Sequence, residues 1–355
     1  MHTQSTYRLL VVRLGAMGDI LHALPAVTAL RQAHPDWQIG WVVEPRWQPL
    51  LAASGTASRG PAMPLIDRLH SAAMGEWKRR PLSPRTASEV KALRRELHAV
   101  NYDAALDFQG AVRSAAIGRM AGCPRCIGEA TPREFAARWL FTERVATRGT
   151  HVIEQDMDLA SAVAGDALSA ADSLLPVDPD AECWCATWLA AMFPGEARPV
   201  ALITPGAGWG AKRWPPERYA AVARGLFDRG LHVLVNAGPG EEPLAEAIAA
   251  GGAAVSLTAT LPQLIALTRR IALCIGGDTG PLHLACALSR PVVGIYGPTD
   301  PSRNGPFGTR ARVLRSPDSR RDHSRRAAPD PGLLTIAPDD VLRATGELLA
   351  EERIG

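Results

Sequence analysis

Along the first 43 residues, the apolar positions change their spacing in the order of a strand, a turn, a helix and a second strand. Leu9 to Val12 is a short apolar run suited to a strand buried on both faces. The small residues from Gly15 to Gly18 predict a turn. From Asp19 onward, apolar residues recur at helical spacing at Ile20, Leu21, Leu24, Val27 and Leu30. Ile39 to Val43 is the next predicted strand, and such a unit opens doubly wound parallel sheets.

The same order of elements returns in the second half of the chain. Further strands are predicted at residues 104–107, 200–204, 231–236, 271–275 and 291–296, and helices at 89–100, 184–192, 216–229 and 338–351. We therefore predict an α/β fold with two Rossmann-like halves. We place the domain boundary at Asp178-Pro179-Asp180, which gives an N-terminal domain of residues 1–177, a C-terminal domain of residues 178–335 and a terminal helix in 336–355. The polar, basic segment 315–330 is predicted to be a loop and has no assigned role.

Composition agrees with two folded domains. The chain has 355 residues, of which 46% are hydrophobic and 21% charged, so each half can bury a core. The net charge of +3 is too small to indicate nucleic-acid binding. Between residues 76 and 148, however, the chain has 14 Lys or Arg residues and 8 Asp or Glu residues, a local excess of six positive charges. This excess fits either an acidic partner or a solvated helix face.

The sequence also bears on location and on metals. No window contains the roughly 18 apolar residues that a membrane-spanning helix needs, and the first apolar run is interrupted at Arg13 and Asp19, which indicates a strand and not a signal peptide. We therefore expect a cytoplasmic protein. Cys123 and Cys126 form one C-x-x-C, but no second pair or paired histidines complete a zinc site, so we expect buried free thiols and no metal.

Ligands of parallel α/β sheets bind beyond the carboxyl ends of the strands, and two such halves would form a cleft there. Four turns are expected at this cleft, at residues 15–19, 205–212, 237–242 and 276–283. In the last of these, a strand ends in glycines and a helix opens after Asp278. Unpaired amides and the helix dipole make that point suited to a diphosphate. The alternative is an ordinary helix cap by Asp278.

Single residues in the other turns carry similar alternatives. Lys212 could neutralise charge on a departing diphosphate, or could be a surface lysine ahead of a helix. Glu241 and Glu242 could accept hydrogen bonds from ribose or adenine, although carboxylates at helix starts are common. Asp19 follows a turn that departs from G-x-G-x-x-G, which disfavours a dinucleotide oxidoreductase. Its carboxylate suits either a general base that takes a proton from an attacking hydroxyl or a helix N-cap.

Several motifs in one order resemble a known family. They are Val12-Arg13-Leu14-Gly15-Ala16-Met17-Gly18-Asp19-Ile20-Leu21-His22-Ala23-Leu24-Pro25, Lys212-Arg213-Trp214-Pro215, Gly277-Asp278-Thr279-Gly280-Pro281-Leu282-His283 and Tyr296-Gly297-Pro298-Thr299-Asp300-Pro301. Together they resemble the ADP-heptose:lipopolysaccharide heptosyltransferases (glycosyltransferase family 9) from about residue 8 to 305. Within that family, Trp41-Val42-Val43-Glu44, Tyr102-Asp103-Ala104, Asp107-Phe108-Gln109-Gly110 and Arg113-Ser114 are most similar to the heptosyltransferase I branch.

The resemblance implies a GT-B architecture in which the C-terminal domain binds the donor. It implies that Asp19 is the catalytic base, that Lys212 meets the donor phosphates, and that Asp278, Thr279, Gly280 and His283 hold ADP-heptose. One of Glu241 and Glu242 would contact the nucleoside. It also places Arg13, Arg113, Arg133, His151 and the basic loop Lys78-Arg79-Arg80 on the side of an anionic acceptor, where Kdo carboxylates and lipid A phosphates would explain the local positive charge. For each of these residues singly, a solvated surface position remains the alternative.

The reaction implied is an inverting single displacement from ADP-heptose to a Kdo hydroxyl of Kdo-lipid A, without a required metal or other cofactor. It would take place at the cytoplasmic face of the inner membrane. The turn Ala207 to Ala211 lacks the polar side chains expected near the phosphates, so backbone amides would have to serve there. Three alternatives remain: another acceptor or nucleotide sugar on the same scaffold, as in a heptosyltransferase II-like enzyme; a non-catalytic module that binds glycolipid or nucleotide sugar; and a dehydrogenase, for which we expect no NAD binding.

Overall fold

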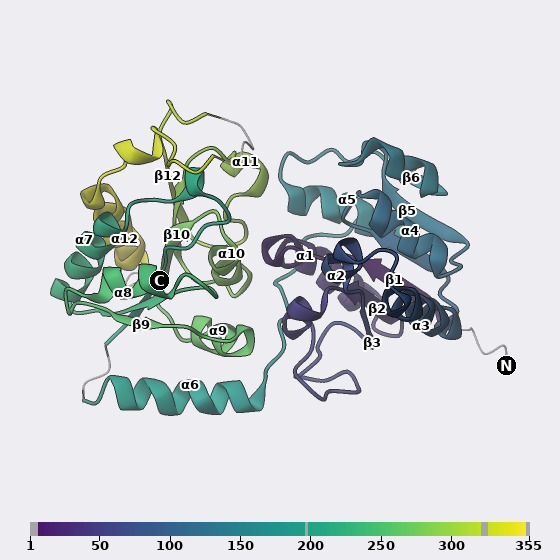
Figure 1. The fold of residues 1–355 in the computed structure, drawn as a ribbon, viewed down its shortest axis with the longest axis horizontal. Helices are drawn as coiled ribbons and strands as arrows, with labels where there is room; N and C mark the ends of the chain where they lie inside the picture. The colour runs from purple at the N-terminus through teal and green to yellow at the C-terminus, as the bar shows by residue number, and fades with distance from the viewer. Residues whose placement is uncertain (1–5, 196–197, 321–325, 353–355) are drawn as a thin grey trace. The chain divides into compact units, whose positions relative to one another are not determined.

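A computed structural model describes residues 6–195, 198–320 and 326–352 of the protein. Contacts divide the chain into two units, Met1–Val177 and Asp178–Gly355. Within the described residues, each unit is built on one six-stranded parallel sheet with helices around it (Figure 1). We describe the two units separately.

The sheet of the N-terminal unit has the strand order β3-β2-β1-β4-β5-β6. Its strands are β1 (Arg8–Val12), β2 (Gln38–Val43), β3 (Arg68–Ser71), β4 (Ala104–Asp107), β5 (Arg125–Glu129) and β6 (Glu143–Val145). Its helices are α1 (Met17–Ala33), α2 (Met74–Arg79), α3 (Pro84–Val100), α4 (Val112–Met120) and α5 (Val152–Ala164), with 3-10 turns η1 (Pro45–Leu50) and η2 (Phe135–Leu140). The order of the strands reverses between β1 and β4, which pair through Leu9–Ala104 to Val12–Asp107.

The predicted burial of the first strand is confirmed. Leu9, Leu10, Val11 and Val12 are completely buried, because β1 lies between β2 and β4 and helices cover both faces of the sheet. Two helices begin earlier than predicted. α1 starts at Met17 and not at Asp19, with Ala16 as its N-cap, so Asp19 lies inside the first turn. α3 starts at Pro84 and not near Glu89, because Pro84 sits at the first helical position, where its missing N–H costs no hydrogen bond.

The sheet of the C-terminal unit has the strand order β12-β11-β10-β7-β8-β9. Its strands are β7 (Val200–Thr204), β8 (His232–Asn236), β9 (Val255–Leu257), β10 (Leu273–Gly277), β11 (Val292–Tyr296) and β12 (Ala311–Arg315). Its helices are α6 (Pro179–Met192), α7 (Pro216–Asp228), α8 (Glu242–Ala249), α9 (Leu261–Thr268), α10 (Gly280–Ala287), α11 (Pro301–Asn304) and α12 (Pro338–Glu352), with 3-10 turns η3 (Gly210–Lys212) and η4 (Leu333–Thr335). Here the order reverses between β7 and β10.

The last helix belongs to the core of the C-terminal unit. Val341, Ala344 and Leu348 of α12 are buried in the same apolar cluster as Val222 and Leu226 of α7. No helix among the described residues is both long enough and apolar enough to cross a membrane.

Four of the five strands that the sequence pattern did not predict are edge strands, namely β3, β6, β9 and β12, and the fifth, β5, lies beside β6. β3, β5, β6, β9 and β12 contain three to five residues each, and their sequences mix charged or polar residues with apolar ones, as in RLHS, ERV and ARVLR. One more strand lies beyond the predicted strand at residues 291–296, because β12 pairs in parallel with β11. A strand of three to five residues has little apolar periodicity to detect, and an edge strand is paired on one side only.

Candidate active site

The reversal of strand order in the C-terminal unit brings two of the predicted turns together. β7 and β10 are neighbours, paired through Ile203–Ile275 and Thr204–Gly276. β7 leads into the turn that carries Lys212, and β10 leads directly into Asp278. In open parallel sheets this switch point is where ligands bind, since the connections leave in opposite directions on its two sides.

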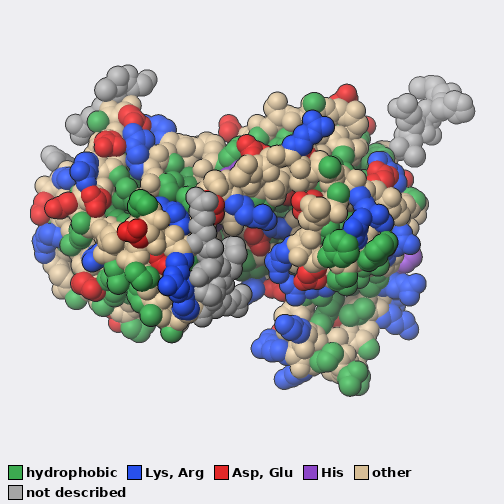
Figure 2. Space-filling model, turned by 90° about the horizontal axis from the view of Figure 1, so that it is seen from above, with side chains coloured by type: hydrophobic (Ala, Val, Ile, Leu, Met, Phe, Trp, Pro, Cys, Tyr) green, Lys and Arg blue, Asp and Glu red, His purple; other side chains and the backbone are tan. Residues whose placement is uncertain are grey.

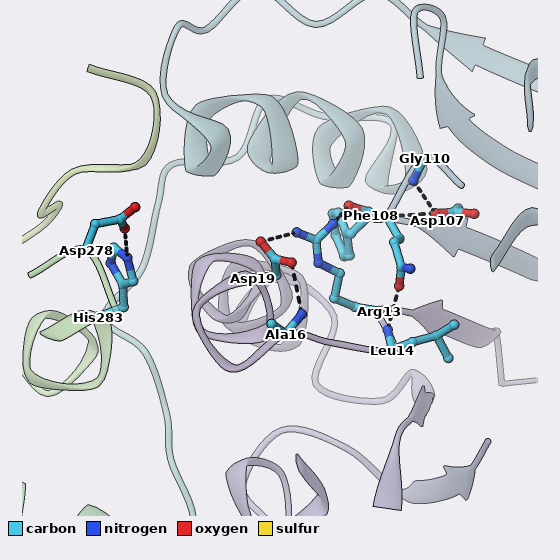
Figure 3. A network of polar contacts seen from close by, with 10 residues as sticks. Arg13, Leu14, Ala16, Asp19, Asp107, Phe108, Gly110, Asp278 and His283 are labelled. Carbon is cyan, nitrogen blue, oxygen red and sulfur yellow. Dashed lines mark hydrogen bonds and ion pairs between the residues drawn. The ribbon is translucent and has the colours of Figure 1, made fainter. Parts of the chain in front are cut away.

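Lys212, Asp278 and His283 form one cluster at this point. The ammonium of Lys212 forms an ion pair with Asp278 Oδ2, and its Nζ lies 4.2 Å from the centre of the Trp209 ring. Nε2 of His283 hydrogen-bonds the other carboxylate oxygen, Oδ1, at 3.0 Å, as Figure 3 shows. All three side chains are largely buried. The cluster therefore joins three predicted donor-site residues from η3, the end of β10 and α10.

The charges around Asp278 keep it ionised. Burial opposes ionisation, but the hydrogen bond and attraction of His283 and the attraction of Lys212 outweigh it, and they hold the pKa of Asp278 well below its usual range. Asp278 is not the N-cap of α10. Thr279 occupies that position in an extended conformation, and Gly280 and Pro281 are the first helical residues. The Asp278 carboxylate therefore has no capping role and binds the side chains of Lys212 and His283 instead.

The two adjacent glutamates differ in what they contact. The Glu241 carboxylate accepts hydrogen bonds from the amide of Ala207, after β7, and from that of Gly238, after β8, both at 3.3 Å. A Cβ at position 206 would overlap this carboxylate, so the approach requires Gly206. Glu242 is the first residue of α8, and backbone hydrogen bonds lower the pKa of its carboxyl group. Glu241 also lines a cavity of about 500 Å³, together with residues that include Arg213, Trp214 and Leu244.

Part of the basic segment that had no assigned role holds the turn carrying Lys212. The amide of Ala211 donates to the carbonyl oxygen of Arg326 at 3.0 Å, and the amide of Asp330 donates to the carbonyl oxygen of Ala211 at 3.1 Å. A Cβ at position 210 would overlap the carbonyl of Ala327. These contacts are made by backbone atoms, so no pattern of side chains in the sequence could predict them. Residues 321–325 lie outside the described residues.

In the N-terminal unit, Asp19 lies at the corresponding switch point. Its Oδ2 accepts a hydrogen bond from the amide of Ala16 at 2.9 Å, and its Oδ1 pairs with Nη2 of Arg13 at 3.2 Å (Figure 3). The Asp19 side chain is 42% exposed, whereas that of Arg13 is 7% exposed. Asp19 is the third residue of α1, so the alternative that it is the N-cap is wrong.

Two buried carboxyl groups were missed by the sequence analysis. Asp107 ends β4, and its Oδ1 accepts hydrogen bonds from the amides of Gln109 (2.7 Å) and Gly110 (2.9 Å). Burial raises its pKa to about 6. Asp156 lies on α5, and burial, aided by the negative charges of Asp19, Glu129 and Asp107 and opposed by Arg13, raises its pKa to about 8. Asp107 belongs to a motif that we used only to assign the branch of the family. For Asp156, the signal in the sequence was an acidic residue on an otherwise apolar helix face.

The residues assigned to the acceptor side by resemblance fall into two groups. Arg113 on α4, Arg133 before η2, and Lys78, Arg79 and Arg80 are exposed. Lys78 and Arg79 lie in the last turn of α2, so the predicted basic loop is partly helical. On the N-terminal unit, at the right of Figure 2, blue Lys and Arg side chains stand with exposed hydrophobic side chains between them.

Arg13 and His151 form the second group, because both are buried. His151 is the N-cap of α5, where its Nδ1 accepts a hydrogen bond from the amide of Ile153 at 3.2 Å. Its ring packs edge-on against the ring of His22, with the centroids 5.7 Å apart. The structure therefore gives both residues internal contacts that the sequence did not predict.

Cysteines and metal-binding groups add no further site within the described residues. All six cysteines are free; five are buried and Cys183 is exposed, so the expectation of buried thiols is wrong for Cys183. No group of three or more His, Cys, Asp or Glu side chains in the described part of the chain is arranged to hold a metal ion.

Comparisons with known proteins identify the family of this chain. The family model "Glycosyltransferase family 9 (heptosyltransferase)" matches residues 90–330. Lipopolysaccharide heptosyltransferase 1 of Escherichia coli (strain K12) is 30% identical over 317 residues, which cover 87% of this chain and 94% of that protein. The enzyme of the same name from Pseudomonas aeruginosa is 28% identical over 85% of this chain and 81% of its own.

A solved structure extends the similarity to three dimensions. "E. coli heptosyltransferase WaaC with ADP" superposes with a TM-score of 0.77 at 26% identity, covering 96% of this chain and 99% of that one. Two six-stranded parallel sheets with flanking helices match this architecture, which confirms the predicted GT-B class of α/β fold with two Rossmann-like domains. On this sequence match and this fold, the chain belongs to glycosyltransferase family 9, the heptosyltransferases.

Proposed function

We propose that the protein is a heptosyltransferase I-like enzyme that moves a heptose from ADP-heptose to a Kdo residue of Kdo-lipid A, with inversion at the anomeric carbon. The observation that supports this best is the cluster of Lys212, Asp278 and His283 at the switch point of the C-terminal sheet. It combines a cation for a diphosphate with a carboxylate for sugar hydroxyls at the start of a helix. A solved structure to which this chain is similar is that of a heptosyltransferase with ADP, which agrees with this chemistry.

In the proposed donor site, the ammonium of Lys212 faces the diphosphate, and the amide end of α10, with Thr279 and Gly280, adds further positive potential. Asp278 holds Lys212 in place and accepts hydrogen bonds from the sugar, as His283 supports its carboxylate. These groups can offset the charge that develops on the departing ADP, so the proposal includes no metal or other cofactor.

The nucleoside contact in this proposal belongs to Glu242. Both oxygens of Glu241 already tie the turns after β7 and β8 together through Ala207 and Gly238. Glu242 is the next residue, at the first position of α8, and it contributes a carboxylate at the N-terminal end of that helix. A ribose hydroxyl can donate to that carboxylate without breaking the contacts of Glu241.

Asp19 is proposed as the general base. Its carboxylate is partly exposed, and two donors orient it, so it can reach a substrate hydroxyl and accept its proton. As that oxygen forms a bond to the anomeric carbon, the bond from this carbon to the β-phosphate oxygen breaks, and ADP leaves with the bonding electrons. The proton remains on Asp19. One displacement of this kind inverts the anomeric configuration.

The acceptor is proposed to bind the N-terminal unit. Lys78, Arg79, Arg80, Arg113 and Arg133 are exposed there and can meet the carboxylates of Kdo and the phosphates of lipid A. The exposed side chains of Phe135 and Trp139 on η2 extend this surface, at 62% and 69% exposure.

The guanidinium of Arg138 lies 4.8 Å from the ring centre of Phe135 and 5.4 Å from that of Trp139, and Arg144 lies 5.6 Å from Trp139. Aromatic rings interleaved with arginines are typical of surfaces that rest on anionic bilayers. We therefore include in the proposal a peripheral position at the cytoplasmic face of the inner membrane, with η2 in contact with the lipid.

The test is product analysis with purified protein. ADP-heptose and Kdo-lipid A should yield ADP and a heptosylated lipid of the inverted configuration. ADP release with an acceptor that already carries heptose, and none with Kdo-lipid A, would instead assign a heptosyltransferase II-like role. Asp19→Ala should lower turnover by roughly 10²- to 10⁴-fold, the usual share of a general base, while ADP binding stays unchanged. Equal turnover in this variant would remove Asp19 from the mechanism.

A further inference from the structure

A buried arginine lies behind the carboxylate assigned as the base (Figure 3). The backbone of Arg13 follows β1, where its carbonyl oxygen accepts a hydrogen bond from Nε1 of Trp41 at 3.0 Å. Its Nη1 donates to the carbonyl oxygen of Phe108, after β4. Arg13 is therefore anchored from inside the N-terminal unit at two points, and it reaches Asp19 through Nη2 alone.

These contacts leave Asp19 with a fixed orientation. Arg13 holds Oδ1 at 3.2 Å, and the amide of Ala16 holds Oδ2 at 2.9 Å. A carboxylate with a donor on each oxygen cannot rotate without breaking one of them. Orientation of the reacting group is a large part of what an active site contributes, and a misplacement of about 1 Å can cost about 10²-fold in rate.

Two more carboxyl groups share the surroundings of this guanidinium. Asp107 and Asp156 both lie in the electrostatic field of Arg13. Within the described residues, Oδ2 of Asp107, Oδ2 of Asp156 and Nε of Arg13 are all buried without a hydrogen-bond partner. Buried polar atoms are normally paired, so three such atoms around one residue need an explanation. One guanidinium carries a single positive charge, and three acids are placed to use it.

We propose that Arg13 is a positioning residue for Asp19, and that Asp156 governs how fully the guanidinium is available to it. This inference rests on the proposed role of Asp19 in heptosyl transfer. It replaces the contact with the acceptor that the resemblance implied for Arg13, because a guanidinium this deeply buried is already engaged by Phe108 and Asp19.

The protonation of Asp156 sets the pH range of the arrangement. Burial raises its pKa to about 8, so at neutral pH it is mostly uncharged and does not compete with Asp19. Above about pH 8 it becomes an anion in the field of Arg13 and shares the positive charge of the guanidinium with Asp19. Other titratable and charged groups come from the elements packed against α5. They are Asp19 and His22 on α1, Arg13 after β1, Asp107 on β4, Glu129 on β5 and His151 at the N-cap of α5. On β6, Glu143 pairs with Arg125.

The experiment measures ADP release from ADP-heptose and Kdo-lipid A by the full chain between pH 6 and 9.5. Arg13→Met should lower kcat by about 10²-fold, with the affinity for ADP unchanged by calorimetry, because the donor residues are in the other unit. Arg13→Lys should recover part of the loss, since an ammonium can still pair with Asp19. Arg94→Met is the matched control: Arg94 is an exposed arginine on α3 of the same unit, and its loss should change nothing.

The pH profile tests the part played by Asp156. In the wild type we expect kcat to fall above about pH 8, and in Asp156→Asn this fall should disappear, because an amide cannot ionise. If Arg13→Met and Arg13→Lys both keep wild-type kcat, the positioning role is wrong. If Asp156→Asn keeps the alkaline fall, Asp156 does not govern the pair. A wild-type protein that releases no ADP would refute the proposed function itself, and this inference with it.

Discussion

The buried carboxyl group of Asp156 should make the stability of the N-terminal unit depend on pH, and replacing it with asparagine should remove that dependence. Asp156 is almost fully buried on α5, and its pKa is raised from the ordinary value of 3.8 to about 8 by burial, with contributions from neighbouring carboxylates. In the folded protein the group keeps its proton up to about pH 8, whereas in the unfolded chain it loses the proton near pH 4. The folded state therefore binds more protons between these two values.

The sign and size of the effect follow from this difference. Because the pKa is raised on folding, the stabilising contribution is fully present below about pH 4 and is lost as the pH rises through about 8. A change in pKa from 3.8 to about 8 corresponds to about 6 kcal/mol, since each unit is worth 1.36 kcal/mol. An asparagine has no proton to lose, so the free energy of unfolding of Asp156→Asn, relative to wild type, should rise by up to about 6 kcal/mol between pH 4 and 8.

The pH dependence is the quantity to compare, and not the stability at one pH. The amide of the new asparagine adds buried donors that cost about 1–3 kcal/mol if unpaired, but that cost is the same at every pH. Urea unfolding followed by pulse proteolysis at pH 5, 6, 7, 8 and 9 would give the free energy of unfolding. Cleavage within β4 and α5 would report the unfolding of the N-terminal unit. Asp166→Asn, an exposed carboxylate just beyond α5, is the control and should follow the wild type. Parallel curves for wild type and Asp156→Asn over this range would refute a raised pKa at this site.

Three further predictions concern the C-terminal unit and the lipid surface. Lys212→Ala should weaken ADP binding about tenfold or more in calorimetry, because a charge-assisted contact is worth about 1.5–3 kcal/mol; an unchanged Kd would count against its phosphate role. Glu241→Ala should lower the Tm by roughly 3–6 °C, since it removes two backbone contacts, whereas Glu242→Ala should weaken ADP binding at an unchanged Tm; the reverse pattern would exchange the two roles. Trp139→Ala should reduce binding to anionic vesicles about tenfold, with no change for Phe227→Ala, the ring beside Arg224 in the other unit; equal losses would exclude η2 as the contact.

The central strands and the turns at their ends could be predicted because a strand buried on both faces appears in the sequence as a continuous apolar run. Leu9 to Val12 and Val200 to Thr204 are continuous apolar runs, and in both sheets they form the strand from which the order reverses. Since ligand-binding turns follow such strands, the same signal located the turns of Asp19 and Lys212. The edge strands left no comparable mark, because Glu143 to Val145 and Val255 to Leu257 bury too little on too few residues.

Contacts between residues far apart in sequence could not be predicted in the same way. The motif around Asp278 placed the residue in the site, but its ion pair with Lys212 joins positions 66 residues apart. The burial of Arg13 depends on Phe108, 95 residues away. Lys212, Asp278 and Arg13 are polar, and a polar residue carries no periodic signal that tells whether it faces solvent or lies buried against a partner. Hence the family resemblance placed Arg13 on the acceptor side, and nothing in the sequence showed that its side chain is buried.

Each switch point contains a basic residue paired with an aspartate, and the two aspartates differ in exposure. This difference bears on what each pair can do. In the C-terminal unit, Lys212 and Asp278 are both about nine-tenths buried. In the N-terminal unit, Arg13 is buried and Asp19 is 42% exposed. A carboxylate enclosed with its counter-ion and a histidine is held ionised and suits binding and positioning, because taking a proton would break two contacts. A carboxylate that is held from behind and open in front can accept a proton from a substrate and return it to solvent. The exposure of the acid, more than its identity, therefore supports the proposal that Asp19 is the base and that Asp278 contacts the donor.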